Sequence, residues 1–373
     1  MSARPRTSAS DSASRKPKLA LVTLLGAAAA FTAACVPGAG NALVPSSATS
    51  TPSSTVPASS SSATSSSAAS TTTTAPTSKV TQPVKPPAPA PGGSVGPGVV
   101  PNAGQVGFLG DQGSLKVIDG AGNAPAGSKW NAGVLQVTAN DLVLDRVFVR
   151  GGITFQGGGT LTIKNSIVEG NRSAQSAVLG LKGHLDISDS TIRWKAGDGG
   201  PQAQWGNGAI HGDSTMTLRR NDISGTPDGI QNGPGRSTIE QNYIHDLARI
   251  GAYPNNTHND GIQSYGGPDL FIRYNRIDIE GPDGVAYDGT HQNGAVFVQP
   301  GGGGASNLQV VGNFLAGGGY IMRLEGPITG AVVTDNKFGP TTGGWGEVLS
   351  EKGVAIAKWA NNVTSSGKAI GQP

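Results

Sequence analysis

A short pattern recurs eight times between Leu144 and Phe338. It consists of an apolar residue, two variable residues, usually an Asn, one variable residue and a second apolar residue. The copies begin at Leu144, Ile163, Ile187, Leu218, Ile239, Ile272, Val310 and Val333. Successive starts lie from 19 residues apart (Leu144 to Ile163) to 38 apart (Ile272 to Val310). A recurrence of this length predicts a solenoid, in which each repeat covers the apolar face of its neighbour.

The fourth position of the pattern is polar in seven of the eight copies. Its occupants are Val147, Ser166, Ser190, Asn221, Asn242, Asn275, Asn313 and Asn336. One Asn in each coil, at the same turn, can form hydrogen bonds with the Asn above and below it. Asn also tolerates the left-handed backbone that a tight turn requires, so the column predicts a turn at this position.

A second apolar segment precedes each copy, usually by 8 to 14 residues, and Ile356 begins a degenerate ninth copy. Segments such as 161–165 and 185–189 alternate apolar with polar residues, which is the period of a half-buried strand. Each repeat therefore contains at least two short strands. Stacked repeats of this kind predict an all-β, single-stranded parallel β-helix of about 9–10 coils.

These features resemble the right-handed parallel β-helix superfamily, the fold of pectate lyases and related polysaccharide-active proteins. The resemblance covers about residues 103–366. It implies a right-handed solenoid and a polysaccharide ligand. The Asn-Thr-Asp, Asp-Asp and Gly-His-Gly set of polygalacturonases is missing from the sequence.

The first 35 residues resemble an export signal. A basic start is followed by the uncharged stretch Leu19 to Ala34 and by Cys35, the single cysteine of the chain. This order is typical of a secretory signal, and the position of Cys35 resembles a bacterial lipobox. Thr32 stands where a lipobox usually has Leu. Ordinary cleavage, for instance after Ala42, is the alternative, although a lone Cys without a disulfide partner favours lipidation.

Residues 36–100 are rich in Ser, Thr, Pro and Ala. Such a segment cannot bury enough apolar surface to fold, so we expect a disordered linker. Residues 101–373 form the β-helix domain in this interpretation. The expected protein is extracellular or on the cell surface, anchored to the membrane as a lipoprotein. The net charge of +3 and the lack of a basic, aromatic-rich cluster favour a monomer that does not bind nucleic acid.

Two Asp-Gly-Ile-Gln motifs predict a binding face. Ile230 and Ile262 point into the core, so Gln231 and Gln263 point outward, because neighbours on a strand face opposite sides. We place further residues in the same outer strip: His211, Gln299, Arg323 and Glu325. Tyr253 and Tyr287 are added from the neighbouring loops, where binding residues usually lie. Strands about 4.8 Å apart allow such a strip to follow a glycan chain.

Candidate catalytic roles follow from chemistry. For a uronate lyase, His258 is the candidate base, Arg323 the carboxylate clamp, and Asp260 either orients His258 or contributes to a Ca²⁺ site. For a hydrolase, two carboxylates are required, and Asp260 with Glu325 or Asp288 are candidates. Alternatively, the two Asp-Gly pairs only form turns and Arg323 only pairs with Glu325. A polysaccharide lyase and a non-catalytic glycan- or partner-binding module therefore both remain open.

Overall fold

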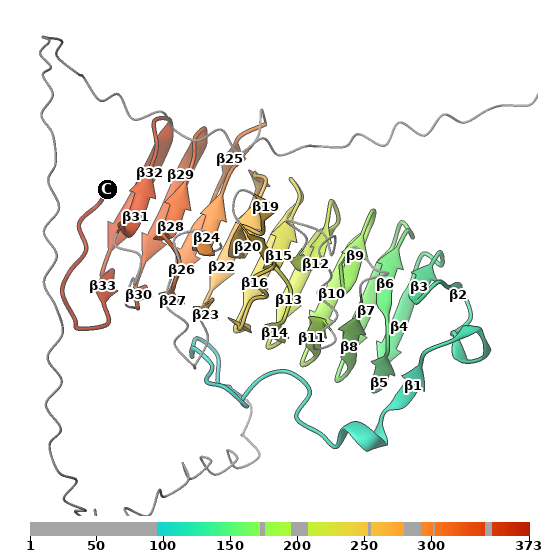
Figure 1. Cartoon of the computed structure of the whole chain (residues 1–373). Coiled ribbons are helices and arrows are strands. Elements are labelled where there is room, and N and C mark those ends of the chain that lie inside the picture. The colour runs from blue at the N-terminus through green and yellow to red at the C-terminus, as the bar shows by residue number, and fades with distance from the viewer. Residues whose placement is uncertain are drawn as a thin grey trace, which may run out of the picture. The chain divides into compact units, whose positions relative to one another are not determined.

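The computed structural model describes residues 95–171, 176–194, 208–252, 255–279, 292–300, 303–339 and 345–373. All of them belong to the unit Thr81–Pro373. Three long sheets run the length of this unit, and we name them A, B and C (Figure 1). Apart from the terminal β2, their strands pair in parallel. Three consecutive strands, one from each sheet, form one coil, and nine such sets from β3–β5 to β31–β33 are described.

Sheet A consists of β1 (Lys116–Ile118), β5 (Val147–Val149), β8 (Ile167–Gly170), β11 (Thr191–Trp194), β14 (Asp222–Ser224), β17 (Tyr243–His245), β23 (Arg276–Asp278), β27 (Phe314–Ala316), β30 (Lys337–Phe338) and β33 (Val363–Thr364). Sheet B consists of β2 (Ser128–Asn131), β3 (Val134–Val137), β6 (Gly152–Phe155), β9 (Val178–Gly180), β12 (Gly208–Gly212), β15 (Asp228–Asn232), β20 (Asn259–Ser264), β24 (Gln292–Val298), β28 (Tyr320–Leu324) and β31 (Gly346–Ser350).

Sheet C consists of β4 (Leu142–Asp145), β7 (Thr160–Lys164), β10 (His184–Ser188), β13 (Thr215–Arg219), β16 (Ser237–Glu240), β22 (Leu270–Arg273), β26 (Gln309–Val311), β29 (Ile328–Thr334) and β32 (Val354–Ala360), with the short β21 (Gly267–Pro268) and β25 (Ala305–Ser306) at its edge. A small hairpin of β18 (Gly251–Ala252) and β19 (Asn255–Asn256) interrupts one coil.

Helical structure is limited to two single turns in the described residues. These are the 3₁₀ helices η1 (Gln112–Ser114) and η2 (Ala121–Asn123). The described part of the chain includes no helix with the length and apolar character that crossing a membrane requires.

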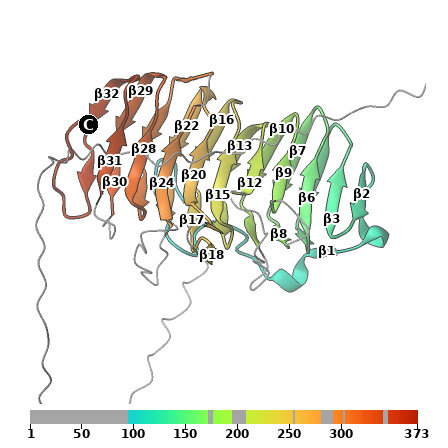
Figure 2. The same cartoon turned by 45° about the horizontal axis from the view of Figure 1, so that its top comes forward.

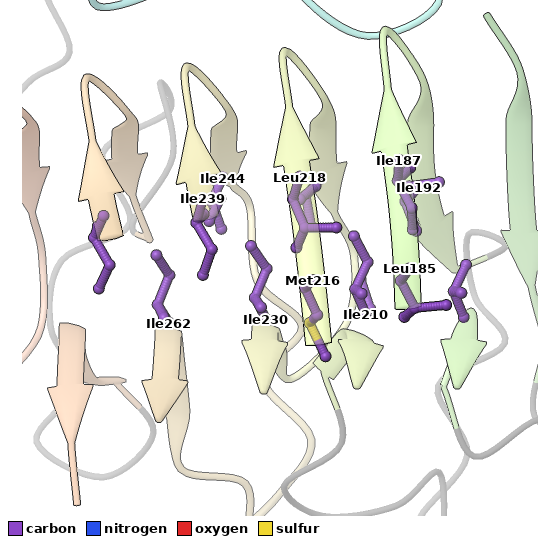
Figure 3. Close-up of a cluster of buried hydrophobic side chains, with 14 of the residues drawn as sticks. Leu185, Ile187, Ile192, Ile210, Met216, Leu218, Ile230, Ile239, Ile244 and Ile262 are labelled. Carbon is purple, nitrogen blue, oxygen red and sulfur yellow. The ribbon is translucent and has the colours of Figure 1, made fainter. Parts of the chain in front are cut away.

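Stacked aliphatic side chains fill the space between the three sheets. Figure 3 shows this arrangement for residues such as Leu185, Ile187, Ile192 and Ile210, all fully buried. Each comes from a strand in which buried residues alternate with more exposed ones, as the sequence predicts. The structure confirms a parallel β-helix, and it contains three strands in each coil, where the sequence predicted at least two.

The Asn column forms a continuous hydrogen-bonded ladder in the core. The Asn242 amide nitrogen donates to Asn275 Oδ1 (3.0 Å) and to the Leu218 carbonyl (2.9 Å), while the Asn242 backbone N–H donates to the same Oδ1 (2.9 Å). The pattern repeats from Asn221 to Asn336 and ends at Asn362. The ladder is therefore confirmed. The ninth copy begins at Trp359, which is in register with Val333, and the prediction of Ile356 was wrong.

The left-handed residues lie one position before the ladder. Their φ angles are 47–61° at Arg146, Asn165, Asp189, Arg220, Gln241, Tyr274, Asp335 and Asn361. The prediction that the ladder Asn residues themselves adopt this conformation was thus wrong. A left-handed non-Gly residue costs about 1–2 kcal/mol, and the buried hydrogen bonds of the next residue offset that cost.

The segment 95–115, which we call the N-terminal strap, runs along the edge between sheets C and A (Figures 1 and 2). The Gln241 amide donates to the carbonyls of Gly96 (2.7 Å) and Val99 (3.0 Å). Further along, the Phe108 backbone N–H donates to Thr191 Oγ1 (3.1 Å). The strap then continues into β1, which pairs with β5, so it covers the first coils of sheet A and leaves sheet B uncovered.

Candidate functional site

The outward-facing residues of sheet B form a regular column. Strand pairing aligns His211 with Gln231, Gln231 with Gln263, Gln263 with Phe297, and Phe297 with Arg323. We call this the first column. It confirms that Gln231 and Gln263 point away from the core, since Ile230 and Ile262 beside them are fully buried.

Gln299 and Glu325 do not belong to the first column, which corrects the prediction. Each follows the end of its strand, two residues after the position that Phe297 and Arg323 occupy. Backbone hydrogen bonds align these positions in a second column, whose members are Tyr265, Gln299, Glu325 and Glu351. The error arose because coils of unequal length do not allow register to be counted from the sequence.

A tight corner places two aspartates on the outer side at the start of their strands. A Cβ at Gly229 would lie 2.5 Å from Ile244 Cγ2, and a Cβ at Gly261 would collide with Ile277. Both glycines therefore face the interior, and only Gly fits there. Asp228 and Asp260, immediately before them, face outward, where Asp228 can contact Gln231.

Hydrogen bonds connect Asp228 to the first column. Asp228 Oδ1 accepts from the Asp260 backbone N–H (2.7 Å), and Oδ2 accepts from Gln231 Nε2 (2.7 Å). Gln231 Nε2 also donates to Gln263 Oε1 (2.8 Å), while the Gly208 backbone N–H donates to Gln231 Oε1 (3.2 Å).

These contacts fix the orientation of both amide groups. The Gly208 N–H requires an oxygen opposite it, so the Gln231 nitrogen must face Asp228 and Gln263. Gln263 then presents its oxygen to Gln231, and the same oxygen accepts from the Tyr265 hydroxyl (3.1 Å). The Gln263 Nε2 group is therefore the part of this half-buried side chain that is directed to a ligand.

The Asp228 carboxyl group is strongly perturbed. Burial raises its pKa to about 7, although the hydrogen bonds from Asp260 and Gln231 and the charge of His258 act in the opposite direction. Asp260 is also buried, and its Oδ2 accepts from Asn293 Nδ2 (3.2 Å). Two carboxyl groups with one titrating near neutrality mark a candidate functional site.

The predicted catalytic residues fall into two groups. His258 is exposed and Asp260 is buried at the start of β20, and both lie near Asp228. Arg323 lies two strands further along sheet B, about 10 Å away. Its Nη2 contacts Glu325 Oε1 (2.6 Å) and Glu351 Oε1 (3.0 Å), and its guanidinium lies 5.0 Å from the Phe297 ring centre.

Glu325 and His211 are shifted by burial as well. Burial raises the pKa of Glu325, and Glu351 adds to this shift, while Arg323 and Gln299 oppose it. Burial lowers the pKa of His211 despite the charge of Asp213, so this imidazole is neutral at pH 7. Within the described residues, His211 Nδ1 is buried and has no hydrogen-bond partner. Tyr253, Tyr287, Asp288 and Cys35 lie outside the described residues.

Sequence reasoning missed the roles of Phe297, Tyr265, Asn293 and Glu351. The signal was available at Asn293-Gly294-Ala295-Val296-Phe297, which continues Asp-Gly-Ile-Gln one coil further. Phe297 replaces the expected Gln, so the motif was not recognised. A Ca²⁺ site was also considered; the parts of the chain that the structure describes contain no group of three or more His, Cys, Asp or Glu able to hold a metal ion.

Comparison with known proteins gives one family. The model described as "Right handed beta helix region" matches residues 130–370. No curated protein and no solved structure matches the chain.

Proposed function

Because this chain belongs to the right-handed β-helix family, a fold with regular outer sheet faces, we propose that sheet B binds a neutral polysaccharide. The hydrogen-bonded series from Asp228 through Gln231 and Gln263 to Tyr265 carries this proposal. It holds polar groups rigidly on an outer face, where a ligand can reach them. Fixing these side chains before binding reduces the entropy that a ligand must overcome.

The spacing of the first column suits an extended glycan. Adjacent members lie on strands about 4.8 Å apart, a scale comparable to one sugar unit. The Gln263 Nε2 group can donate to a hydroxyl or ring oxygen, and the Tyr265 ring lies beside it in the second column. A chain running along the stack would meet such groups at successive strands.

Charge favours a neutral glycan over a uronate. Arg323, the residue expected to clamp a uronate carboxylate, already contacts both Glu325 and Glu351. A uronate would have to compete with these two carboxylates and would also be repelled by them. We therefore prefer a neutral ligand to the substrate of a uronate lyase.

Gln263→Ala is expected to weaken glycan binding about tenfold, because it removes the oriented donor and releases Gln231 and Tyr265. The measurement is affinity electrophoresis of the full-length chain in gels containing xylan, mannan or β-1,3-glucan, with polygalacturonate and alginate as acidic comparisons. Gln136→Ala is the matched control, since Gln136 occupies the same column five strands away. Equal retardation of both variants, or retardation only by the acidic polymers, would contradict the proposal.

Hydrolysis is the second candidate function. The observation that favours it is Asp228, whose pKa of about 7 suits a proton donor, on the strand adjacent to a second carboxyl group, Asp260. The same polysaccharides, incubated with the protein, should then yield reducing ends without absorbance from unsaturated uronates. Binding without new reducing ends restricts sheet B to recognition.

We further propose that the protein is exported and held at the cell surface through a lipid on Cys35. The support is the order of basic residues, apolar stretch and cysteine at the N-terminus. With Ser- and Thr-rich residues 36–100 as a spacer, sheet B would then meet extracellular glycans.

Cys35→Ser is expected to shift the protein from the membrane fraction to the soluble fraction, because a hydroxyl cannot replace the acylated thiol. Fractionation of expressing cells followed by immunoblotting measures this distribution, with Ser46→Ala as the control. Equal membrane association of the two variants, or a mature N-terminus at Leu43, would overturn lipidation at Cys35.

A further inference from the structure

The C-terminal coils of sheet B carry an exposed aromatic pair. Trp345, immediately before β31, is 57% exposed, and its ring contacts Tyr320 of β28 edge-to-face at a centroid distance of 5.7 Å. Among the Trp side chains that the structure describes, Trp345 alone is exposed. Such exposure of a large apolar ring is costly unless it serves recognition.

Glycine allows this ring to lie flat against the backbone. A Cβ at Gly319 would lie 2.5 Å from Trp345 Cε3 and 2.7 Å from Cζ3, so the six-membered part of the indole rests on Gly319. One face of the ring is covered in this way. Its exposed surface therefore belongs to the other face, which is the geometry of a stacking platform.

The aromatic pair continues the face that holds Gln263. Between Asp260 and Tyr320 the facing position is Gly294, which carries no side chain. From β20, which contains Gln263, to β31 the order is β20-β24-β28-β31 (Figures 1 and 2), or three strand spacings, about 14 Å. A glycan lying on Gln263 can thus reach Trp345 after a few sugar units.

We infer that Trp345 and Tyr320 form a stacking subsite for a pyranose ring of the neutral glycan that binds at Gln263. This inference rests on the proposed function and adds the direction in which the glycan extends, toward the C-terminal coils. The apolar C–H face of a pyranose packs on the indole, while its equatorial hydroxyls remain in water. The adjacent Arg323–Glu325–Glu351 group is internally paired and adds no uncompensated positive charge.

The test compares long and short oligosaccharides on the full-length chain. The probes are xylohexaose, mannohexaose and laminarihexaose, each beside its disaccharide, measured by isothermal titration calorimetry. Trp345→Ala is expected to weaken hexasaccharide binding about tenfold and to change disaccharide binding less than about twofold, because a disaccharide cannot span both positions. Trp345→Phe should restore much of the loss.

A second variant displaces the ring without removing it. Gly319→Ala places a methyl group where the indole rests, so it should weaken hexasaccharide binding as well. Val143→Ala is the control, because Val143 is also exposed (60%) but lies on sheet C. In the parent, the hexasaccharide should protect Trp345 from acrylamide quenching.

The possible failures are distinct. Hexasaccharide binding that Gln263→Ala weakens but Trp345→Ala leaves unchanged overturns the subsite and leaves the proposed function intact. A parent protein that binds none of the six probes overturns the proposed function, and the subsite with it.

Discussion

Asn275→Ala is expected to lower the free energy of unfolding by about 3–5 kcal/mol. The Asn275 amide nitrogen donates to the Ile239 carbonyl (2.8 Å) and to Asn313 Oδ1 (3.1 Å). Its Oδ1 accepts from both nitrogens of Asn242 (2.9 and 3.0 Å). Alanine removes all four bonds and leaves buried groups of Asn242 and Ile239 without partners, where no water can replace them.

Urea unfolding of the full-length chain, followed by circular dichroism, measures this loss. Asn102→Ala is the control, since Asn102 is exposed on the N-terminal strap. Asn275→Ser should cost less than Asn275→Ala, because Ser190 in the same ladder accepts from the Ser166 backbone N–H through its hydroxyl (3.1 Å). An Asn275→Ala variant as stable as the Asn102→Ala variant would show that the ladder does not stabilise the fold.

The fold was predictable because the repeat encodes it directly. Five ladder Asn residues and the apolar positions beside them recur in the sequence, and stacking requires them to align. Asn362 was missed because its copy runs from Trp359 to Thr364, and a polar residue replaces the second apolar position. The left-handed turn was assigned one residue too late, since the sequence shows a column of Asn but not the φ angles of its neighbours.

The site was predictable only in part. Alternation along a strand was enough to direct Gln231 and Gln263 outward. The burial of Asp228, however, depends on a corner at Gly229, where two successive residues face the interior. Its bond to Gln231 and the separation of Arg323 from Asp260 depend on register across coils of unequal length. These are properties of the stack, and they are not contained in any single repeat.

Asp228→Asn is expected to remove a large pH dependence of stability. Burial raises the pKa of Asp228 from 3.8 to about 7, so the folded state holds a proton that the unfolded state releases between these values. The stabilisation from this group is complete below about pH 3.8 and is lost as the pH rises through about 7. A shift of about three units corresponds to about 4 kcal/mol.

The measurement is the free energy of unfolding of parent and variant from pH 4 to pH 8. Other titrating groups are common to both proteins, so the difference between the two curves isolates Asp228. The parent should be the more stable at pH 4 and should lose about 4 kcal/mol relative to Asp228→Asn by pH 8. Asp213→Asn, at an exposed position near His211, controls for the removal of a carboxyl group. Parallel curves would contradict the raised pKa of Asp228.

Ionisation of Asp228 should affect glycan binding in the opposite direction. An ionised carboxylate accepts a stronger hydrogen bond from Gln231 Nε2 than a neutral carboxyl group does, and Gln231 in turn orients Gln263. We therefore expect the parent to bind the glycan more tightly as the pH rises through about 7, while its stability falls. In Asp228→Asn, the side-chain amide replaces one acceptor oxygen with a donor, so binding should be weaker and independent of pH. An affinity that falls together with stability in the parent would show that Asp228 supports the fold but not the orientation of Gln263.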